Sequence, residues 1–486
     1  MTDRVAWHPP WYAWTAIGLG ILALISVRLA WLLRGHWLVV SVSLLIVLVY
    51  LLHRLWELPP AVMMCVALVL TIFSGNWSSL GLPGFPFLPD RMLIVGVVLA
   101  LALRAPGTSG RPAIKVRPVH LLLLLLAFYA MASAVAAGTL GTQSGMFALL
   151  DRLGIVPFVV FLLAPVIFSG PHERNMLLVT LVGLGAYLGI TAVFESLGPH
   201  ALVFPHYIVT SDAALGEARA SGPFESSVTE GFANFACAVA AVMACSQWRG
   251  SHKRYLAAAV AVVCIFGCFL TLERGVWIAA VGGAVVAALC TRGGRRWVIP
   301  GALVCALVIG GALVLSPALA GKTASRASYQ RSVWDRKNQT SAGLRMIESR
   351  PLFGFGWHRF EEDGLSYFRQ PADYPMTGYS TPERPLVLHN LYLSTAVELG
   401  LVGAVLWLTA LLWGVGGAIF SRGSADLRPW KLGLLAIGTF FVIIAFVNPQ
   451  QQNFTELLLW AWAGVALGAA RRSPLRTYPA IQPARA

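Results

Sequence analysis

The chain has 486 residues, of which 57% are hydrophobic and only 12% are charged, against roughly one quarter charged residues in ordinary soluble domains. This composition excludes a soluble enzyme and predicts an all-α polytopic membrane protein, because apolar runs long enough to cross a bilayer as helices recur from end to end. The formal charge of +15 lies mainly in short loops between these runs, so it reports membrane topology rather than binding to nucleic acid.

The length of the apolar runs predicts about fourteen transmembrane helices. Before a long polar segment they are expected near residues 12–33, 37–52, 59–75, 91–104, 118–138, 151–169, 175–197, 228–247, 255–271, 275–291 and 297–316. After it they are expected near 389–420, 430–448 and 454–470.

The basic turns predict the sidedness. The arginine-rich end at Arg471 and Arg472 is taken as cytoplasmic, and threading backwards then puts most basic turns on that same side of a plasma (inner) membrane. Two substantial segments fall on the extracytoplasmic face, near 198–230 and from about 317 to 388. A loop this long is usually functional or disordered. Its aromatic clusters, such as Phe353, Phe355 and Trp357, favour a structured lid of short helices at the bilayer surface.

We therefore expect five parts: N-terminal helices at 1–197, helices that carry outer-face arginine motifs at 198–316, an extracytoplasmic loop domain at 317–388, C-terminal helices at 389–470 and a cytoplasmic tail at 471–486. The spans themselves hold few charges, and the polar motifs gather on the extracytoplasmic face. That distribution predicts an active site on this face.

Two arginines stand out on this face. Arg219 precedes a Gly222-Pro223 turn, where its guanidinium can bind a phosphate bidentately or simply pair with Glu217 or Glu225; the sequence leaves both readings open. Glu273 and Arg274 fill a very tight turn between two apolar runs. A charge pair at membrane depth is expensive unless it is paired or used, so a functional role is weighed there against a self-satisfied Glu-Arg pair.

The long outer segment carries the next motifs. A short amphipathic helix is expected from about 338 to 349, stopped by Pro351 and followed by Gly354 and Gly356, which permit a sharp turn. Glycines in such a pattern are weak evidence of function. The consecutive acids Glu361, Glu362 and Asp363 cannot all converge on one cation, so we predict a solvated loop and no metal site.

His389 opens the helix that follows the long segment. At a helix N-terminus the positive end of the dipole disfavours a protonated imidazole, and a neutral imidazole suits a general base. The alternative is an interfacial histidine that caps the helix or bonds a backbone carbonyl. Arginines on the same face favour the base.

Taken in order, these motifs resemble the O-antigen ligase and O-antigen polymerase family. The resemblance is carried by Arg219-x-x-Gly222-x-Phe224, Glu273-Arg274-Gly275, Gly343-Leu-Arg-Met-Ile, Pro351-Leu-Phe-Gly-Phe-Gly and His389-Asn390-x-Tyr392 with Glu398-x-Gly400-x-x-Gly403. The His-Asn segment after a long outer loop is the most specific part of this pattern.

What the resemblance implies is an inverting, metal-independent membrane glycosyltransferase of C-type architecture, without a cofactor. Its donor would be a glycan on a polyprenyl diphosphate such as undecaprenyl diphosphate, and its acceptor a hydroxyl of another glycan or glycolipid, both reached from the membrane lipids. In this pattern His389 is the base, and Arg219 and Arg274 bind the diphosphate. Arg331 and Arg345 are further diphosphate candidates. The supporting residues are Asn390, Tyr392, Glu398, Glu225 and Glu273.

Two other functions compete with this one. A transporter or flippase of lipid-linked or anionic solutes would also use arginines, but it should carry ionisable residues or broken helices near the bilayer midplane. A peptidoglycan glycosyltransferase of the shape, elongation and division type would share the donor but rely on an outer-loop aspartate, for which Asp335, Asp363 and Asp373 are available. Spans with few charges favour the surface enzyme.

Overall fold

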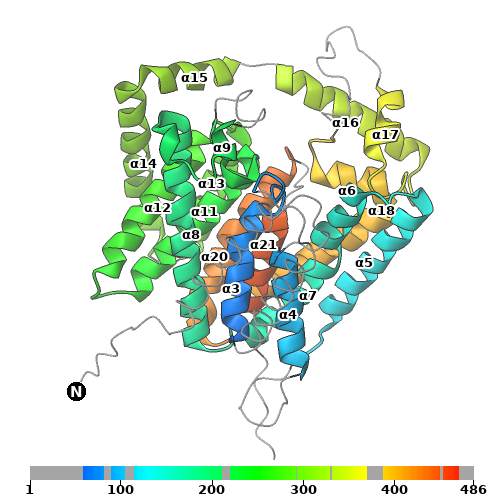
Figure 1. Cartoon of the computed structure of the whole chain (residues 1–486), viewed down its shortest axis with the longest axis horizontal. Coiled ribbons are helices and arrows are strands. Elements are labelled where there is room, and N and C mark those ends of the chain that lie inside the picture. The colour runs from blue at the N-terminus through cyan, green and yellow to red at the C-terminus, as the bar shows by residue number, and fades with distance from the viewer. Residues whose placement is uncertain are drawn as a thin grey trace, which may run out of the picture.

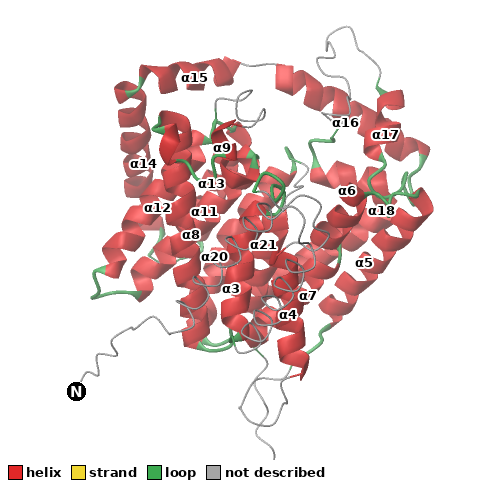
Figure 2. Cartoon of the chain, viewed as in Figure 1, coloured by secondary structure: helices red, strands yellow, loops and turns green. Residues whose placement is uncertain are grey.

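The computed structural model describes residues 58–80, 89–103, 114–210, 219–291, 293–328, 331–368, 387–448 and 453–469. Within these ranges the secondary structure is helical and contains no strand (Figure 2). The expected spans at 12–33 and 37–52 and the tail at 471–486 lie outside the described residues.

The helices follow the predicted apolar runs closely. The first group comprises α3 (Pro60–Leu70) with η1 (Thr71–Phe73), α4 (Pro89–Leu103), α5 (Pro118–Ala137), α6 (Gln143–Ala148), η2 (Leu149–Leu153), α7 (Ile155–Ile167) and α8 (Pro171–Leu197). The second comprises η3 (His200–Leu202), α9 (Tyr207–Thr210), η4 (Gly222–Phe224), α11 (Ser227–Gln247), α12 (Lys253–Leu270), α13 (Arg274–Leu289) and α14 (Arg295–Leu315). Several begin with proline, whose missing N–H and fixed φ suit the first turn.

A further group forms the long polar segment, and a last group returns to the bundle. The segment contains α15 (Pro317–Ser328), α16 (Arg331–Ser349), α17 (Phe360–Asp363) and η5 (Gly364–Tyr367). The return consists of α18 (Leu391–Leu411), η6 (Leu412–Gly416), α19 (Gly417–Ile419), η7 (Ala425–Leu427), α20 (Arg428–Ala445) and α21 (Asn453–Leu467).

The described part of the chain contains eight helices long and apolar enough to cross a membrane, with two shorter apolar helices at Pro60–Phe73 and Arg274–Leu289. This supports a polytopic membrane protein, while the expected number of about fourteen spans stays a prediction. Two helices form the centre of the bundle. Every residue of α21 is buried, and α11 is buried over most of its length because its alanines and glycine let neighbouring helices approach closely.

The long polar segment lies across one end of the bundle, where α15, α16 and α17 cover the helix ends (Figure 1). Its helix α16 begins at Arg331, seven residues before the expected start at 338. The apolar periodicity begins only near Ala342, so the sequence pattern missed the polar first turns. Met346 of α16 packs with Phe360, Leu388 and Val397, which fixes the segment onto α18. We call 317–368 the lid.

A break in α18 joins the lid to the bundle. At Gly400 the backbone leaves the helical conformation, with φ 69° and ψ −179°. The lid residues 351–356 fill the gap with four backbone hydrogen bonds: Phe355 N to Val397 O (2.9 Å), Gly356 N to Glu398 O (2.9 Å), Leu401 N to Pro351 O (2.8 Å) and Val402 N to Leu352 O (3.3 Å). Tyr129 of α5 donates to the carbonyl of Leu399 (2.8 Å). Backbone groups freed inside a membrane helix must be satisfied by protein in this way.

Gly354 and Gly400 are both required by this contact between residues 351–356 and 397–402, which we call the clasp. A Cβ on Gly354 would meet backbone atoms of residues 397, 398 and 400, and a Cβ on Gly400 would meet the Leu352 carbonyl. Just beyond, Trp357 is fully buried and bonds to Ser133, Thr139 and the Gly145 carbonyl. The glycine pattern therefore serves a close approach of two backbones.

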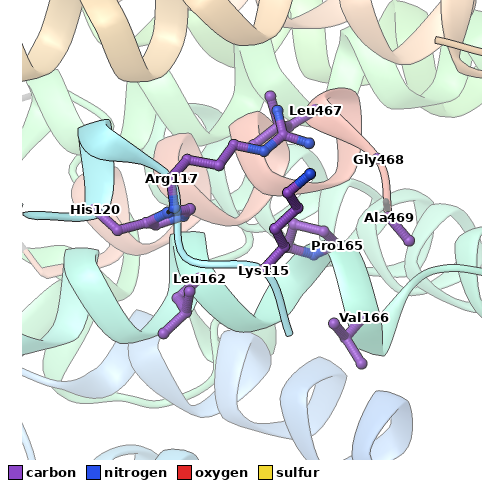
Figure 3. A pocket seen from close by; sticks show the side chains of 9 residues that line it. All are labelled: Lys115, Arg117, His120, Leu162, Pro165, Val166, Leu467, Gly468 and Ala469. Carbon is purple, nitrogen blue, oxygen red and sulfur yellow. Dashed lines mark hydrogen bonds between the residues drawn. The ribbon is translucent and has the colours of Figure 1, made fainter. Parts of the chain in front are cut away.

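The opposite end of the bundle carries basic turns. Arg174 pairs with Asp426 and donates to the Ser169 carbonyl at 2.6 Å. A small hollow at this end lies among α5, α7 and the end of α21, and Lys115 and Arg117 are among the residues that line it (Figure 3). The positive-inside rule predicts that a basic end of this kind faces the cytoplasm, and this sidedness stays a prediction.

Candidate active site

The turn that carries Arg219 is fixed by the end of α8. The carboxylate of Glu195 accepts hydrogen bonds from the Ser221 backbone N (2.9 Å), the Ser221 hydroxyl (2.9 Å) and the Gly222 backbone N (3.0 Å). The carbonyl of Pro223 accepts from Tyr207 at 2.7 Å. These bonds form the expected Gly-Pro turn before α11 and hold Arg219 at the lid end of the bundle.

The turn between α12 and α13 places Glu273 beside Arg219. Ala220 N donates to the Leu270 carbonyl at 3.0 Å, which ties the two turns together. Leu272 adopts a left-handed conformation (φ 48°) that a branched side chain rarely takes, and it is held there by burial. Such strain costs about 1–3 kcal/mol and gathers at functional sites. The left-handed turn at Leu272 lets Glu273 occupy the N-cap position of α13 directly after this buried leucine.

Glu273 bridges two arginines from different parts of the chain. Its Oε2 pairs with Arg219 Nη1 at 2.9 Å, and its Oε1 pairs with Arg336 Nη2 at 3.1 Å. Both guanidinium groups are partly buried, Arg219 with 18% and Arg336 with 32% of its side chain exposed. Of the pairings considered from sequence, neither the Glu273–Arg274 pair nor an Arg219–Glu225 pair is the one observed here; Glu217 lies outside the described residues.

The helix α16 brings Arg336 to this cluster and Gln339 to His389. Residues three apart on a helix share a face, so Arg336 and Gln339 lie on the same side of α16, with Arg336 reaching Glu273 and Gln339 reaching His389. Gln339 is buried with 7% of its surface exposed, and its Oε1 accepts from the His389 backbone N (3.2 Å) and contacts His389 Nδ1 (2.9 Å). One helix therefore carries an arginine of the cluster and a partner of the histidine.

His389 lies just before the first turn of α18 and is exposed. Its Nδ1 also lies 3.1 Å from the Val387 carbonyl, an acceptor, so Nδ1 carries the proton. The Nε2 lone pair is then available, and no hydrogen bond to it comes from the described residues. The pKa of His389 is lowered from its ordinary value, first by the protein atoms that replace water around the ring and then by the nearby Arg336 charge. The sequence also predicts a disfavoured protonated ring, but it assigns the cause to the helix dipole rather than to burial and Arg336.

The other predicted arginines lie in different settings. Arg274 is the first residue of α13 and is exposed beside the Glu273 turn. Arg345, also on α16, donates to the Tyr367 carbonyl at 3.2 Å and so joins two segments within the lid. Arg331 is the first residue of α16, and its side chain lies outside what the structure describes.

The supporting residues near His389 have structural partners. Asn390 caps α18, because its side-chain oxygen accepts from Leu393 N at 3.0 Å. Tyr392 donates to the Val442 carbonyl at 3.0 Å and so ties α18 to α20. Glu225 belongs to a different segment, the turn before α11, where it ends η4 in a left-handed conformation.

Glu398 belongs to a separate buried polar layer beneath the lid. There Arg152 donates to the Thr395 hydroxyl at 3.3 Å, lies over the Trp357 ring, and interacts electrostatically with Glu398 and Glu456. A neighbouring pair in this layer joins Arg91 to Asp151. The expectation of spans with few charges does not hold here, because counting charges along the chain cannot show that distant ones pair inside the bundle.

The acidic run in the lid is paired rather than convergent. Arg359 contacts Glu362 at 2.5 Å and Asp363 at 3.2 Å. Among the residues that the structure describes, no group of three His, Cys, Asp or Glu side chains has the arrangement of a metal site.

Sequence reasoning missed Arg336 and Gln339. Both lie in the polar run that precedes the apolar part of α16. The available signal was their spacing: residues 336, 339, 343 and 346 follow one helical face, on which Gly343 and Met346 pack against α18 and its preceding segment. Extending the helix back to Arg331 would have placed both polar residues on that face.

Residues 233–408 match the family described as O-antigen ligase. The matched segment contains Glu273, Arg274, Arg336 and His389, whereas Arg219 precedes it. The resemblance noted from the sequence is thereby confirmed over this segment, which supports assignment to the O-antigen ligase and polymerase family. A comparison with curated proteins found no match.

Proposed function

We propose that the protein is an extracytoplasmic glycosyltransferase that moves a glycan from a polyprenyl diphosphate to a hydroxyl of a glycan or glycolipid acceptor. The family match supports a membrane glycosyltransferase of the O-antigen ligase or polymerase type. The observation that carries the finer proposal is the meeting of Arg219, Arg336 and His389 around Glu273 and α16, at the end of the bundle covered by the lid.

The proposed reaction is one displacement at the anomeric carbon. The acceptor oxygen attacks that carbon while its proton passes to Nε2 of His389, and the bond from the carbon to the diphosphate oxygen breaks. The leaving polyprenyl diphosphate keeps the electron pair of the broken bond. Attack opposite the leaving group inverts the configuration. The imidazolium then releases its proton to water, which restores the base.

The arginines act on the charge that develops on the leaving oxygens. A guanidinium has five N–H donors in a planar fork, so it can bind a phosphate while it also contacts a carboxylate. Glu273 would hold Arg219 and Arg336 in place before the donor arrives, with Arg274 at the same turn. One such preorganised donor is worth about 3–4 kcal/mol by analogy with an oxyanion hole, and a general base adds about 10²- to 10⁴-fold.

A transporter remains the second candidate, because α18 is broken and the polar layer is buried, both of which are transporter features. The details favour the enzyme. The break at Gly400 is closed by lid backbone rather than left to line a cavity. In the polar layer Arg91 pairs with Asp151, and Arg152 lies in the field of Glu398 and Glu456. For the peptidoglycan-enzyme alternative, Asp363 is paired with Arg359 and Asp373 lies outside the described residues. Asp335, whose charge acts on His389, is the aspartate that this alternative would use.

Product analysis of the purified protein tests the proposal. The protein is given a polyprenyl-diphosphate oligosaccharide from its host, with and without a candidate acceptor. A ladder without added acceptor indicates a polymerase, and a single acceptor-dependent shift indicates a ligase. If the wild-type protein never consumes the donor, the enzyme proposal is wrong and the transporter is favoured.

A further inference from the structure

We propose that Gln339 is a positioning residue for His389: its side-chain oxygen holds the imidazole so that Nε2 faces the acceptor hydroxyl. Arg336, which lies on the same helix, is thereby held at a fixed distance from the base. This inference rests on the proposed function, because it assigns a role relative to a base. It adds a residue from the lid to the machinery, so the lid would help to form the site as well as cover it.

The hydrogen bonds determine which way the amide and the ring face. The His389 backbone N–H can only donate, so the atom of Gln339 at 3.2 Å from it must be the oxygen. The same oxygen lies 2.9 Å from Nδ1, which must therefore donate as well. The neutral ring then has its lone pair on Nε2. One glutamine oxygen thus fixes both the backbone and the side chain of the histidine.

The Val387 carbonyl contributes only partly to orienting the His389 ring. Its carbonyl, 3.1 Å from Nδ1, also accepts from the ring, but it belongs to the same short segment and moves with it. Gln339 comes from α16, which is fixed to α18 independently: Gly343 lies against Leu393 so closely that a Cβ would come within 2.9 Å of it. Gln339 therefore fixes the position of the imidazole relative to α16, a helix separate from the segment that carries His389.

The contact between Gln339 and His389 matters for the proposed reaction because Arg336 lies on the same helix as Gln339. Arg336 lies one turn before Gln339 and reaches Glu273. The helix α16 therefore sets the distance between the base and an arginine proposed to bind the leaving diphosphate. The charged groups that face His389 are Arg336 and Asp335 from α16 and Glu273 from the turn before α13. Replacing the neutral glutamine by a carboxylate adds a negative charge directly at Nδ1, and this favours the protonated ring.

Two substitutions test the inference in the transfer assay. Gln339→Leu removes the acceptor, and a displaced base is expected to lower kcat by about 10- to 100-fold while KM for the polyprenyl-diphosphate oligosaccharide stays within about twofold. Gln339→Glu keeps an acceptor and is expected to move the acid limb of the kcat/KM profile to higher pH by about one unit. A residue that only packs α16 against the bundle would not move this midpoint.

Thr340→Ala is the matched control, because Thr340 is exposed and donates only to the carbonyl of Arg336 in its own helix. It should leave both kcat and the midpoint unchanged. The inference is overturned if Gln339→Leu is folded and keeps wild-type kcat, or if Gln339→Glu leaves the midpoint unchanged. Should Gln339→Leu fail to elute as a single species in detergent, the near-isosteric Gln339→Glu decides alone.

Failure of the underlying proposal looks different from failure of this inference. An inactive wild-type protein, or an active His389→Ala variant, contradicts the transferase or its base. An inactive His389→Ala variant together with an unmoved Gln339→Glu midpoint contradicts only the role of Gln339.

Discussion

Replacing Gly400 by alanine tests whether the clasp between the lid and α18 holds the site together. Gly400 has φ 69° with an extended ψ, a region that essentially only glycine occupies. The added methyl group would also overlap the Leu352 carbonyl. Both effects push residues 351–356 away from the broken helix.

The magnitude follows from the geometry. Backbone strain of this kind costs about 1–3 kcal/mol. Displacing the Leu352 carbonyl opens the bonds from Leu401 N (to Pro351 O) and Val402 N (to Leu352 O), each worth about 1 kcal/mol. The expected loss of stability is therefore about 3–5 kcal/mol. Transfer should fall as well, because α16 and His389 are attached to the two sides of this clasp.

The assay is thermal unfolding in detergent followed by tryptophan fluorescence, together with the transfer rate. Gly310→Ala is the control: Gly310 lies in α14, and a Cβ there meets nothing within 4 Å. It should be neutral or stabilise by up to about 1 kcal/mol, as glycine-to-alanine changes in helices do. An unfolding temperature for Gly400→Ala equal to that of the wild type, with normal transfer, would refute the reasoning.

The arginine assignment predicts that Arg219→Ala and Arg336→Ala each lower transfer by about 10²- to 10³-fold, with lysine rescuing only partly because a point charge lacks the planar fork; normal donor turnover in the alanine variants would show that the assignment is wrong. Because the pKa of His389 lies below its ordinary value of about 6.5, kcat/KM should stay level down to that pH and fall below it as the base is protonated; an acid limb with its midpoint above neutrality would argue against His389. EDTA should leave transfer unchanged, and a loss that Mg²⁺ restores would reopen the lid acids around Glu362 as a metal site.

The apolar spans could be predicted because their signal is local. A run of about twenty apolar residues must be satisfied by its own helix in a bilayer, whatever its neighbours are. The ends of α5 and α11, for instance, fall within a residue or so of the expected 118–138 and 228–247. The start of α16 was missed because its first turns are polar, and a polar helix is stabilised by contacts with the rest of the fold rather than by its own pattern.

The members of the site were easier to predict than their partners. The types of Arg219, Glu273 and His389 and their places at the ends of apolar runs pointed to the lid end of the bundle. The observed partner of Glu273 is not the adjacent Arg274, because consecutive residues at a helix start point in different directions. Glu273 is paired instead with Arg219 and Arg336, which lie 54 and 63 residues away in sequence. Rules based on local sequence spacing cannot predict pairs that are so far apart.

The glycines show the same limit most clearly. Gly354 and Gly400 are far apart in sequence, and each is required because the backbone of the other approaches it. Nothing in the sequence around either residue indicates that approach. The motif was visible, but its purpose depends on a contact between two segments that only the fold brings together.

The most direct test of the central claim compares His389→Ala and His389→Gln with the wild type, using the polyprenyl-diphosphate oligosaccharide and its acceptor. Each variant should elute as a folded species and still bind the donor, because the Arg219–Glu273–Arg336 cluster is intact, yet neither should form product. Substantial transfer by either variant would contradict His389 as the base and with it the proposed mechanism.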